Sequence, residues 1–172
     1  MTGSDQHTKD LARDDIRPGE KTVELPDRQD AHLLFIGRIS TPWKSRDECP
    51  RQGKHDGPLC TIEVFEPWHD ALRGLEHFQQ VEVLYWLDRA RRDLVLQNPV
   101  RDGTLRGTFA LRSPARPNPI GTSMVKLAEI GKGYLVVQGL DCVDGTPLID
   151  LKPNRCEFTP LAVMKSGERK AV

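Results

Sequence analysis

Short apolar-rich segments alternate with glycine- and proline-containing turns between residues 32 and 151. In the clearest segment, Gln80–Asp88, the side chains at 81, 83, 85 and 87 share one apolar face, which is the period of a β-strand. Six further segments have the length and composition typical of strands. The seven expected strands are His32–Ile39, Leu59–Phe65, Gln80–Asp88, Gly107–Arg112, Thr122–Ile130, Gly133–Asp141 and Pro147–Leu151.

One short helix is expected after Pro67, because proline is tolerated in the first turn of a helix. The sequence that follows is WHDALRGLEHF, in which Gly74 is a break or a cap. Several short strands and one short helix predict a mainly β chain, folded as a single closed or nearly closed β-barrel of six to seven strands. The apolar run Tyr134–Val137 predicts a strand buried on both faces, one of them covered by a partner chain.

The two ends of the chain differ in composition from the barrel region. Residues 1–28 carry mixed charges and no aromatic side chain, which favours a disordered tail, with a docking arm as the alternative. The barrel domain is expected over residues 29–160, and residues 161–172 form a polar C-terminal tail. No apolar run approaches the roughly 20 residues of a membrane span.

The charges are unevenly distributed although the formal net charge is zero. Between residues 88 and 126 there are seven arginines and one lysine against three aspartates. This asymmetry predicts an anionic partner for one surface. The alternative is that these arginines pair with acids elsewhere in the chain.

Common cofactor and metal motifs are absent from the sequence. There is no G-x-G-x-x-G and no P-loop, and no two of the four cysteines form a C-x-x-C pair. The five histidines lack metal-ligand spacing, so no metal site is expected. His55 is either a substrate contact or an ordinary exposed histidine of a glycine-rich loop.

A proline-rich segment, RSPARPNPIG at Arg112–Gly121, contains three prolines, two arginines and no acid. Three prolines exclude a helix, and a strand tolerates proline only at an edge or an end. We therefore expect a stiff, extended loop that displays Arg112, Arg116 and Asn118.

The longer segment around this loop, GTFALRSPARPNPIGTSMVKL, resembles the signature of the TsaA/TrmO-like family. Three other blocks resemble the same family in the same order. They are IGRISTPWK with CPRQG, LRGLEHF, and LDCVDGTPLIDLKP. The resemblance covers about residues 34–160 and implies a six- to seven-stranded β-barrel that binds S-adenosylmethionine and forms a homodimer.

The activity that the resemblance implies is methyl transfer to N6 of a threonylcarbamoyl-modified adenosine beside the tRNA anticodon, in the cytoplasm. An acid can hold the cofactor's amino group or ribose hydroxyls, and an arginine its carboxylate. The cofactor-binding residues implied are Arg51, Gln52, Gly53, Asp88, Arg89, Arg112, Thr122, Gly139, Leu140 and Asp141.

For the transfer step we expect Arg116, Asn118, Asp141 and Asp144 near the acceptor, with the two aspartates as candidate bases. Asp144 also begins an ordinary Asp-Gly turn, and Arg112 and Arg116 can instead pair with acids that stiffen the loop. The acceptor is tRNA or, alternatively, another RNA or a small molecule. A non-catalytic barrel that binds the cofactor or RNA is the remaining alternative.

Three positions depart from the family pattern. The usual FSH-[IL]-W is FQQVE here, so Gln80 and Glu82 replace a histidine and a tryptophan, and the usual KPY ends in Asn154. Longer members carry an additional C-terminal domain, for which the residues after Phe158 are too few. These departures leave the expected barrel intact and bear on the identity of the acceptor.

Overall fold

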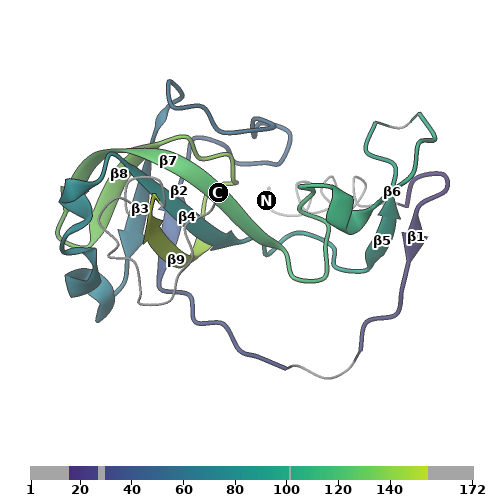
Figure 1. Ribbon diagram of the computed structural model, residues 1–172, viewed down its shortest axis with the longest axis horizontal. Coiled ribbons are helices and arrows are strands. Elements are labelled where there is room, and N and C mark those ends of the chain that lie inside the picture. Colours follow the sequence, from purple (N-terminus) through teal and green to yellow (C-terminus); the bar gives the residue numbers. More distant parts are fainter. Residues whose placement is uncertain (1–15, 27–29, 101, 155–172) are drawn as a thin grey trace, which may run out of the picture.

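The computed structural model describes residues 16–26, 30–100 and 102–154. Its body is a closed antiparallel barrel of six strands in the order β2-β3-β8-β7-β4-β9, and a three-stranded sheet, β1-β5-β6, lies to one side of it (Figure 1). The elements are β1 (Lys21–Thr22), β2 (Gly37–Ser40), β3 (Leu59–Val64), η1 (Trp68–Leu72), η2 (Leu75–His77), β4 (Gln80–Trp86), β5 (Leu94–Gln97), β6 (Arg106–Gly107), η3 (Thr108–Ala110), β7 (Ile120–Gly131), β8 (Tyr134–Gln138) and β9 (Thr146–Pro153).

The barrel encloses a core of inward-facing aliphatic side chains. Along β4, Val81, Val83 and Tyr85 are buried while their neighbours are half-buried, which confirms the predicted face. Burying one large aliphatic side chain contributes about 1.5–3 kcal/mol. The other fully buried aliphatic residues of the core are Ile39, Ile62, Val125, Leu135, Val137, Leu140 and Leu148. The predicted six- to seven-stranded barrel is confirmed, with six strands.

The expected helix after Pro67 forms as two short 3-10 segments, η1 and η2. Gly74 separates them with a left-handed backbone (φ +95°), a conformation that glycine adopts without steric cost. Leu72 and Leu75 are the buried residues of η1 and η2. The segment therefore covers the barrel with two residues rather than with one continuous helical face.

The strand expected over Gly107–Arg112 is wrong beyond its first residue, because residues 108–110 form the 3-10 segment η3. The Thr108 hydroxyl donates a hydrogen bond to the carbonyl of Leu94 (2.6 Å), and such local side-chain bonds compete with sheet pairing. The strand β5 was not predicted, and it pairs with β6 outside the barrel.

The run Tyr134–Val137 alternates instead of being buried on both faces. Leu135 and Val137 are inaccessible to solvent, whereas the Tyr134 side chain is 36% exposed and Val136 is half-buried. The closed barrel supplies one buried face, and within the described residues the other face stays partly open to solvent. The argument for a partner chain over this strand therefore loses its basis.

Part of the segment predicted as a disordered tail, residues 1–28, forms a strand. Residues 16–26 contain β1, which pairs antiparallel with β5 (Lys21 with Leu96, Thr22 with Leu94). Residues 1–15 and the C-terminal tail over 161–172 lie outside the described residues. None of the helical segments in the described part of the chain has the length and apolar character needed to cross a membrane.

Candidate functional site

A cleft of about 1040 Å³ opens beside one end of the barrel, which exceeds the usual volume of a pocket for one small molecule. Its walls come from the loop 46–55, the end of β4 with the residues that follow it, the proline-rich loop, the start of β7, and the residues after β8. One further residue, Arg17, comes from the N-terminal segment. The cleft therefore gathers segments that are far apart in the sequence.

Ten of the thirteen site residues expected from the sequence line this cleft. They are Arg51, Gln52, Gly53, Asp88, Arg89, Arg112, Arg116, Thr122, Gly139 and Asp141. Leu140, Asn118 and Asp144 do not line it.

The Asp141 carboxylate is held in place by three donors from different elements. Its Oδ1 accepts hydrogen bonds from the Tyr85 hydroxyl (2.7 Å) and the Ser123 hydroxyl (3.1 Å). Its Oδ2 accepts a longer bond from the backbone N–H of Gly53 (3.3 Å). A carboxylate has about four acceptor positions, so Oδ2 retains capacity for a ligand in the cleft.

Tyr85 donates its hydrogen bond to Asp141 from inside the barrel, where the tyrosine side chain is 4% exposed. Burial first, and then the negative charge of Asp141, raise the pKa of Tyr85, so its hydroxyl stays protonated and donates. Gly121 lies opposite Tyr85 in the ladder, and a Cβ there would stand 2.1 Å from the Tyr85 ring. The glycine of the family signature thus makes room for the tyrosine.

Two glycines bring the 46–55 loop against the barrel. A Cβ on Gly53 would lie 1.7 Å from the carbonyl oxygen of Gly139, which only a glycine permits. Gly139 itself has a left-handed backbone (φ +114°) and ends β8. Next to it, His55 Nε2 lies 2.9 Å from the carbonyl oxygen of Met124. The histidine therefore fastens the loop, and it also lines the cleft.

Arg112 and Thr122, which both line the cleft, are in direct contact. The Arg112 guanidinium donates to the Thr122 hydroxyl (3.0 Å) and to its carbonyl oxygen (3.3 Å). No carboxylate of the described residues pairs with Arg112, and its side chain is exposed. The contact orients the guanidinium while leaving donors for an anionic ligand.

The proline-rich loop, residues 112–121, is braced from the small sheet. Gln97 at the end of β5 is buried and donates to the carbonyl of Ala115 (2.7 Å) and to the Thr108 hydroxyl (2.9 Å). Arg92 donates to the carbonyl of Pro117 (2.6 Å). These contacts restrain the loop in addition to its prolines.

Part of the arginine excess is structural. Arg91 forms a two-pronged ion pair with Asp93 (2.8 and 2.7 Å), and Arg92 stacks over the Trp86 ring at 5.6 Å. Arg91 thus follows the alternative in which the arginines pair with acids of the chain, and Arg92 packs against the protein itself. Neither residue lines the cleft, whose arginines are a separate group.

Six arginines line the cleft against two acids, Asp88 and Asp141. The six are Arg17, Arg46, Arg51, Arg89, Arg112 and Arg116. Such an excess of one sign in a concave surface attracts a ligand of opposite charge.

Three expected site residues lie elsewhere for identifiable reasons. Leu140 is 1% exposed and belongs to the core. Asn118 is exposed, and its backbone carbonyl accepts from Ile120 N–H (2.8 Å) as part of the loop turn. Their neighbours Gly139 and Arg116 do reach the cleft.

Asp144 serves the turn rather than the cleft. Its carboxylate accepts from the backbone N–H of Thr41 (3.1 Å) and from Lys44 Nζ (2.7 Å). The Lys44 ammonium holds the pKa of Asp144 below its usual range, so it is a poor proton acceptor. These contacts favour the alternative in which Asp144 is a residue of the Asp-Gly turn.

Cleft residues that sequence reasoning missed include Tyr85, Ser123, Arg46 and Cys49. A tyrosine in an apolar strand face was a usable signal, because a buried phenol requires a hydrogen-bond partner. Cys49 gave no such signal. Burial raises the pKa of its thiol to about 11, with Asp141 adding to the effect, so it is neutral near pH 7.

The departures from the family pattern lie away from the cleft. Asn154 donates to the side-chain oxygen of Gln80 (2.9 Å), so these two replacements satisfy each other between β9 and β4. Glu82 pairs with Lys152 in the same ladder. None of these residues lines the cleft.

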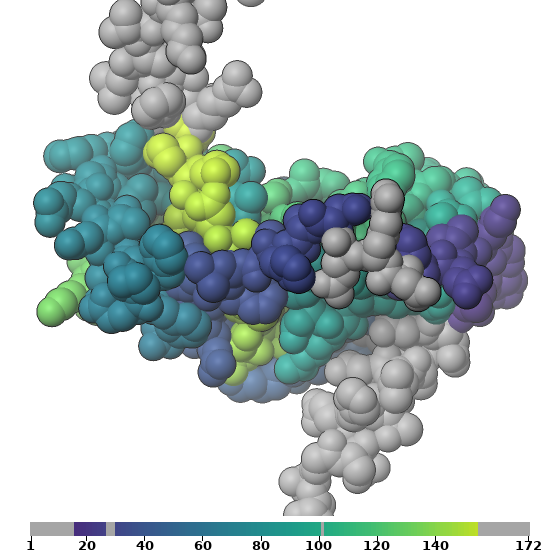
Figure 2. All heavy atoms as spheres, turned by 90° about the horizontal axis from the view of Figure 1, so that it is seen from below, coloured from purple at the N-terminus to yellow at the C-terminus, as the bar shows by residue number. Residues whose placement is uncertain are grey.

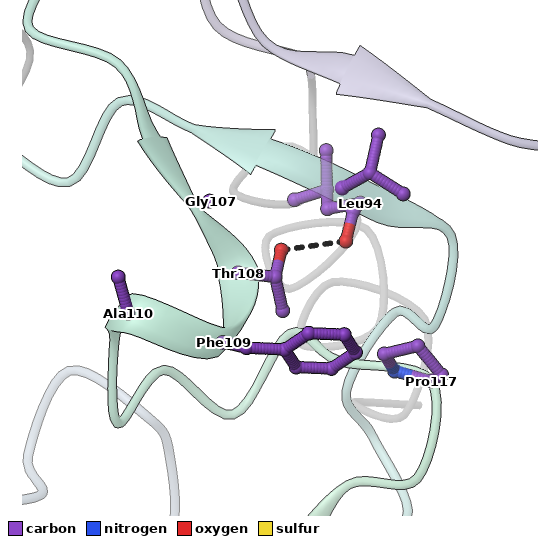
Figure 3. A pocket seen from close by; sticks show the side chains of 7 residues that line it. Leu94, Gly107, Thr108, Phe109, Ala110 and Pro117 are labelled. Carbon is purple, nitrogen blue, oxygen red and sulfur yellow. Dashed lines mark hydrogen bonds between the residues drawn. The ribbon is translucent and has the colours of Figure 1, made fainter.

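A second, smaller pocket of about 160 Å³ lies under the proline-rich loop (Figure 3). In this view the Phe109 ring lies beside Pro117, and Thr108 points to the Leu94 carbonyl. Phe109 is nevertheless 82% exposed, the highest fraction among the large apolar residues of the described chain.

Metal-ligating side chains do not cluster in the described residues. Over residues 16–26, 30–100 and 102–154, no three His, Cys, Asp or Glu side chains are arranged to hold an ion. The charged groups of the cleft are instead mainly guanidinium groups, with the carboxylates of Asp88 and Asp141.

A closed barrel with a fixed carboxylate and an arginine-rich cleft defines a ligand-binding barrel for an anionic or zwitterionic molecule. The chain belongs to the family described as tRNA-methyltransferase O N-terminal domain, which matches residues 38–158. The predicted family is thereby confirmed.

Several relatives carry names that bear on function. The chain is 53% identical over 152 residues to a probable S-adenosyl-L-methionine-binding protein, VirR, of Rhizobium radiobacter, covering 88% of this chain and 87% of that protein. It is 36% identical over 129 residues to the tRNA (adenine(37)-N6)-methyltransferase of Escherichia coli, covering 69% of this chain and 55% of that protein.

Solved structures agree with the fold. A crystal structure of TrmO from Pseudomonas aeruginosa superimposes with a TM-score of 0.60 at 29% identity, over 84% of this chain and 63% of that chain. The chain thus spans just over half of the E. coli methyltransferase and less than two thirds of this solved structure.

The Asp141 network yields a stability prediction. Tyr85→Phe removes one donor from a partly buried carboxylate, so the free energy of unfolding should fall by about 1–3 kcal/mol. Tyr134→Phe is the matched control, because its hydroxyl donates to Glu129 (2.7 Å) at the surface and its loss should change stability by less than about 0.5 kcal/mol. Urea unfolding measures both, and equal effects would contradict the central place of Tyr85.

Proposed function

We propose that this protein is an S-adenosylmethionine-dependent methyltransferase that acts on tRNA. The proposed reaction is methylation of N6 of a threonylcarbamoyl-modified adenosine next to the anticodon. The family and the names of the relatives support this proposal. The observation that carries it is the Asp141 carboxylate, fixed by Tyr85, Ser123 and Gly53 in an arginine-rich cleft.

The donor set of the cleft fits S-adenosylmethionine. This molecule has an ammonium group and ribose hydroxyls, which need an acceptor, and a carboxylate, which needs a cation. Asp141 Oδ2 has free acceptor capacity, and Arg112 is oriented by Thr122 with unused donors. Asp141 would hold the amino group or the ribose, and Arg112 or Arg51 would hold the carboxylate.

When bound, the cofactor supplies an electrophilic methyl group on a sulfonium. The chain contributes alignment, because holding two reactants in line can lower the activation free energy by several kcal/mol. The braced proline-rich loop places Arg116 at the cleft, where it would orient an oxyanion of the acceptor. Of the two candidate bases, only Asp141 lies in the cleft.

The arginine excess favours tRNA over a small neutral acceptor. S-adenosylmethionine carries a net positive charge, so six arginines exceed what its single carboxylate needs. A polyanion such as RNA accounts for the remainder. The tRNA substrate in turn implies a cytoplasmic location.

Methyl transfer is tested by incubating the protein with labelled S-adenosylmethionine and bulk tRNA and then locating the label. Label on N6 of threonylcarbamoyl-adenosine is expected. Asp141→Asn keeps the shape of the side chain but loses its charge, so the affinity for S-adenosylhomocysteine in calorimetry should fall about ten- to hundredfold. Asp144→Asn, outside the cleft, is the control and should bind normally.

Label on a small molecule only would contradict the tRNA proposal and leave a methyltransferase. Absence of cofactor binding by the wild-type protein would contradict both.

A homodimer is proposed on the strength of the family resemblance and of Phe109. This side chain belongs to the family signature, yet it is 82% exposed, and phenylalanine is enriched at protein–protein interfaces. Light scattering should therefore give about twice the chain mass of 19.4 kDa. Phe109→Asp should yield the monomer, whereas Tyr134→Asp, on the strand first suspected, should not. A wild-type monomer at micromolar concentration would contradict the proposal.

A further inference from the structure

The family domain begins at residue 38, but the ordered chain that contributes to the cleft begins earlier. Residues 16–26 precede the match, and β1 within them pairs with β5. Val23 N–H extends this ladder by donating to the carbonyl of Asp93 (2.9 Å). Figure 2 shows this segment, in purple at one end of the molecule, against the small sheet.

A carboxylate clamp holds the start of the segment to the end of β5. One oxygen of Glu20 accepts from the backbone N–H of Asn98 and the other from the backbone N–H of Arg17, both at 2.9 Å. The Asn98 side chain donates to the carbonyl of Pro18 (3.4 Å). Because Asn98 is 2% exposed, these bonds anchor the segment in a buried place.

The clamp fixes Arg17 at the wall of the cleft. Its Nη1 donates to the carbonyl oxygens of Asn98 (2.8 Å) and, at longer range, Pro99 (3.5 Å). No carboxylate of the described residues contacts its guanidinium, since Glu20 bonds only backbone N–H groups. An arginine has five donors, so Arg17 presents a half-buried, unneutralised charge with most donors unused.

Such a half-buried arginine without a carboxylate partner is unfavourable in the absence of an anion, because burial weakens its hydration. An anion bound by Arg17 would lie on the side of the cleft next to the small sheet, away from Asp141, because Arg17 is anchored beside β5. A phosphate of a nucleic-acid backbone has the required charge and accepts forked hydrogen bonds from arginine.

We propose that Arg17 binds a backbone phosphate of the RNA substrate, so that the segment before the family domain completes the substrate site. This inference rests on the function proposed above. It assigns to residues 16–26 a role in binding RNA, and it leaves cofactor binding to the barrel side of the cleft.

The experiment measures binding of a fluorescent anticodon stem-loop RNA to the full chain by anisotropy at several salt concentrations. Arg17→Gln should raise Kd about five- to tenfold at low salt. It should also reduce the salt slope by about 0.7, the value for one phosphate of a single strand. Affinity for S-adenosylhomocysteine should stay within twofold of the wild type.

Two further variants make the result specific. Arg17→Lys keeps the charge and should restore the salt slope. Lys21→Gln removes the same charge from the same segment outside the cleft, and it should bind RNA like the wild type. An Arg17→Lys variant as weak as Arg17→Gln would show a merely structural role and overturn the inference.

Stem-loops with and without the threonylcarbamoyl group should lose affinity equally in Arg17→Gln. A loss confined to the modified RNA would assign Arg17 to the carboxylate of that group and contradict the phosphate contact. Unchanged binding by Arg17→Gln, with a wild type that binds RNA, would overturn only this inference. A wild type that neither binds nor methylates RNA would overturn the proposed function as well.

Discussion

The hydrogen bonds around the Asp141 carboxylate connect the parts of the protein that form the cleft. Tyr85 comes from β4, Ser123 from β7 and Gly53 from the loop over the barrel end. These donors satisfy both oxygens of the half-buried carboxylate, which offsets the cost of removing it from water. Hydrogen bonds to one side chain, Asp141, therefore link β4 and β7 to the loop 46–55.

That arrangement depends on small residues as much as on polar ones. Gly121 leaves space for the Tyr85 ring, and Gly53 lies against the carbonyl of Gly139. On the opposite wall, Gln97 and Arg92 fasten the proline-rich loop to the small sheet. The cleft is thus prearranged on both sides, which limits the entropy lost when a ligand is fixed.

The sequence predicted the barrel well because its strands follow a simple rule. Val81 and Val83 alternate with more polar neighbours, and the closed barrel buries one face of each strand. The same rule failed at residues 108–110, where a threonine hydroxyl competes with sheet pairing. It also missed β1 and β5, which are held largely by pairing and by the Glu20 clamp rather than by an apolar stripe.

The sequence predicted those site residues whose side-chain chemistry suits a ligand. It was less successful where tertiary contacts determine the role of a residue. The resemblance identified Asp141 and Arg112, which do line the cleft. As candidate bases, Asp141 and Asp144 were both left open, because both are aspartates near one turn and only the fold shows that Lys44 and Thr41 bind the carboxylate of Asp144. Arg17 lies outside the matched domain, so no motif could have indicated it.

The most direct test of this account is a crystal structure of the protein with S-adenosylhomocysteine. The account predicts that the amino group or a ribose hydroxyl lies about 2.7–3.2 Å from Asp141 Oδ2, while Tyr85 and Ser123 still donate to Oδ1. The ligand carboxylate should contact a cleft arginine. A ligand bound elsewhere, or an Asp141 that has left Tyr85 and Ser123 without contacting the ligand, would contradict it.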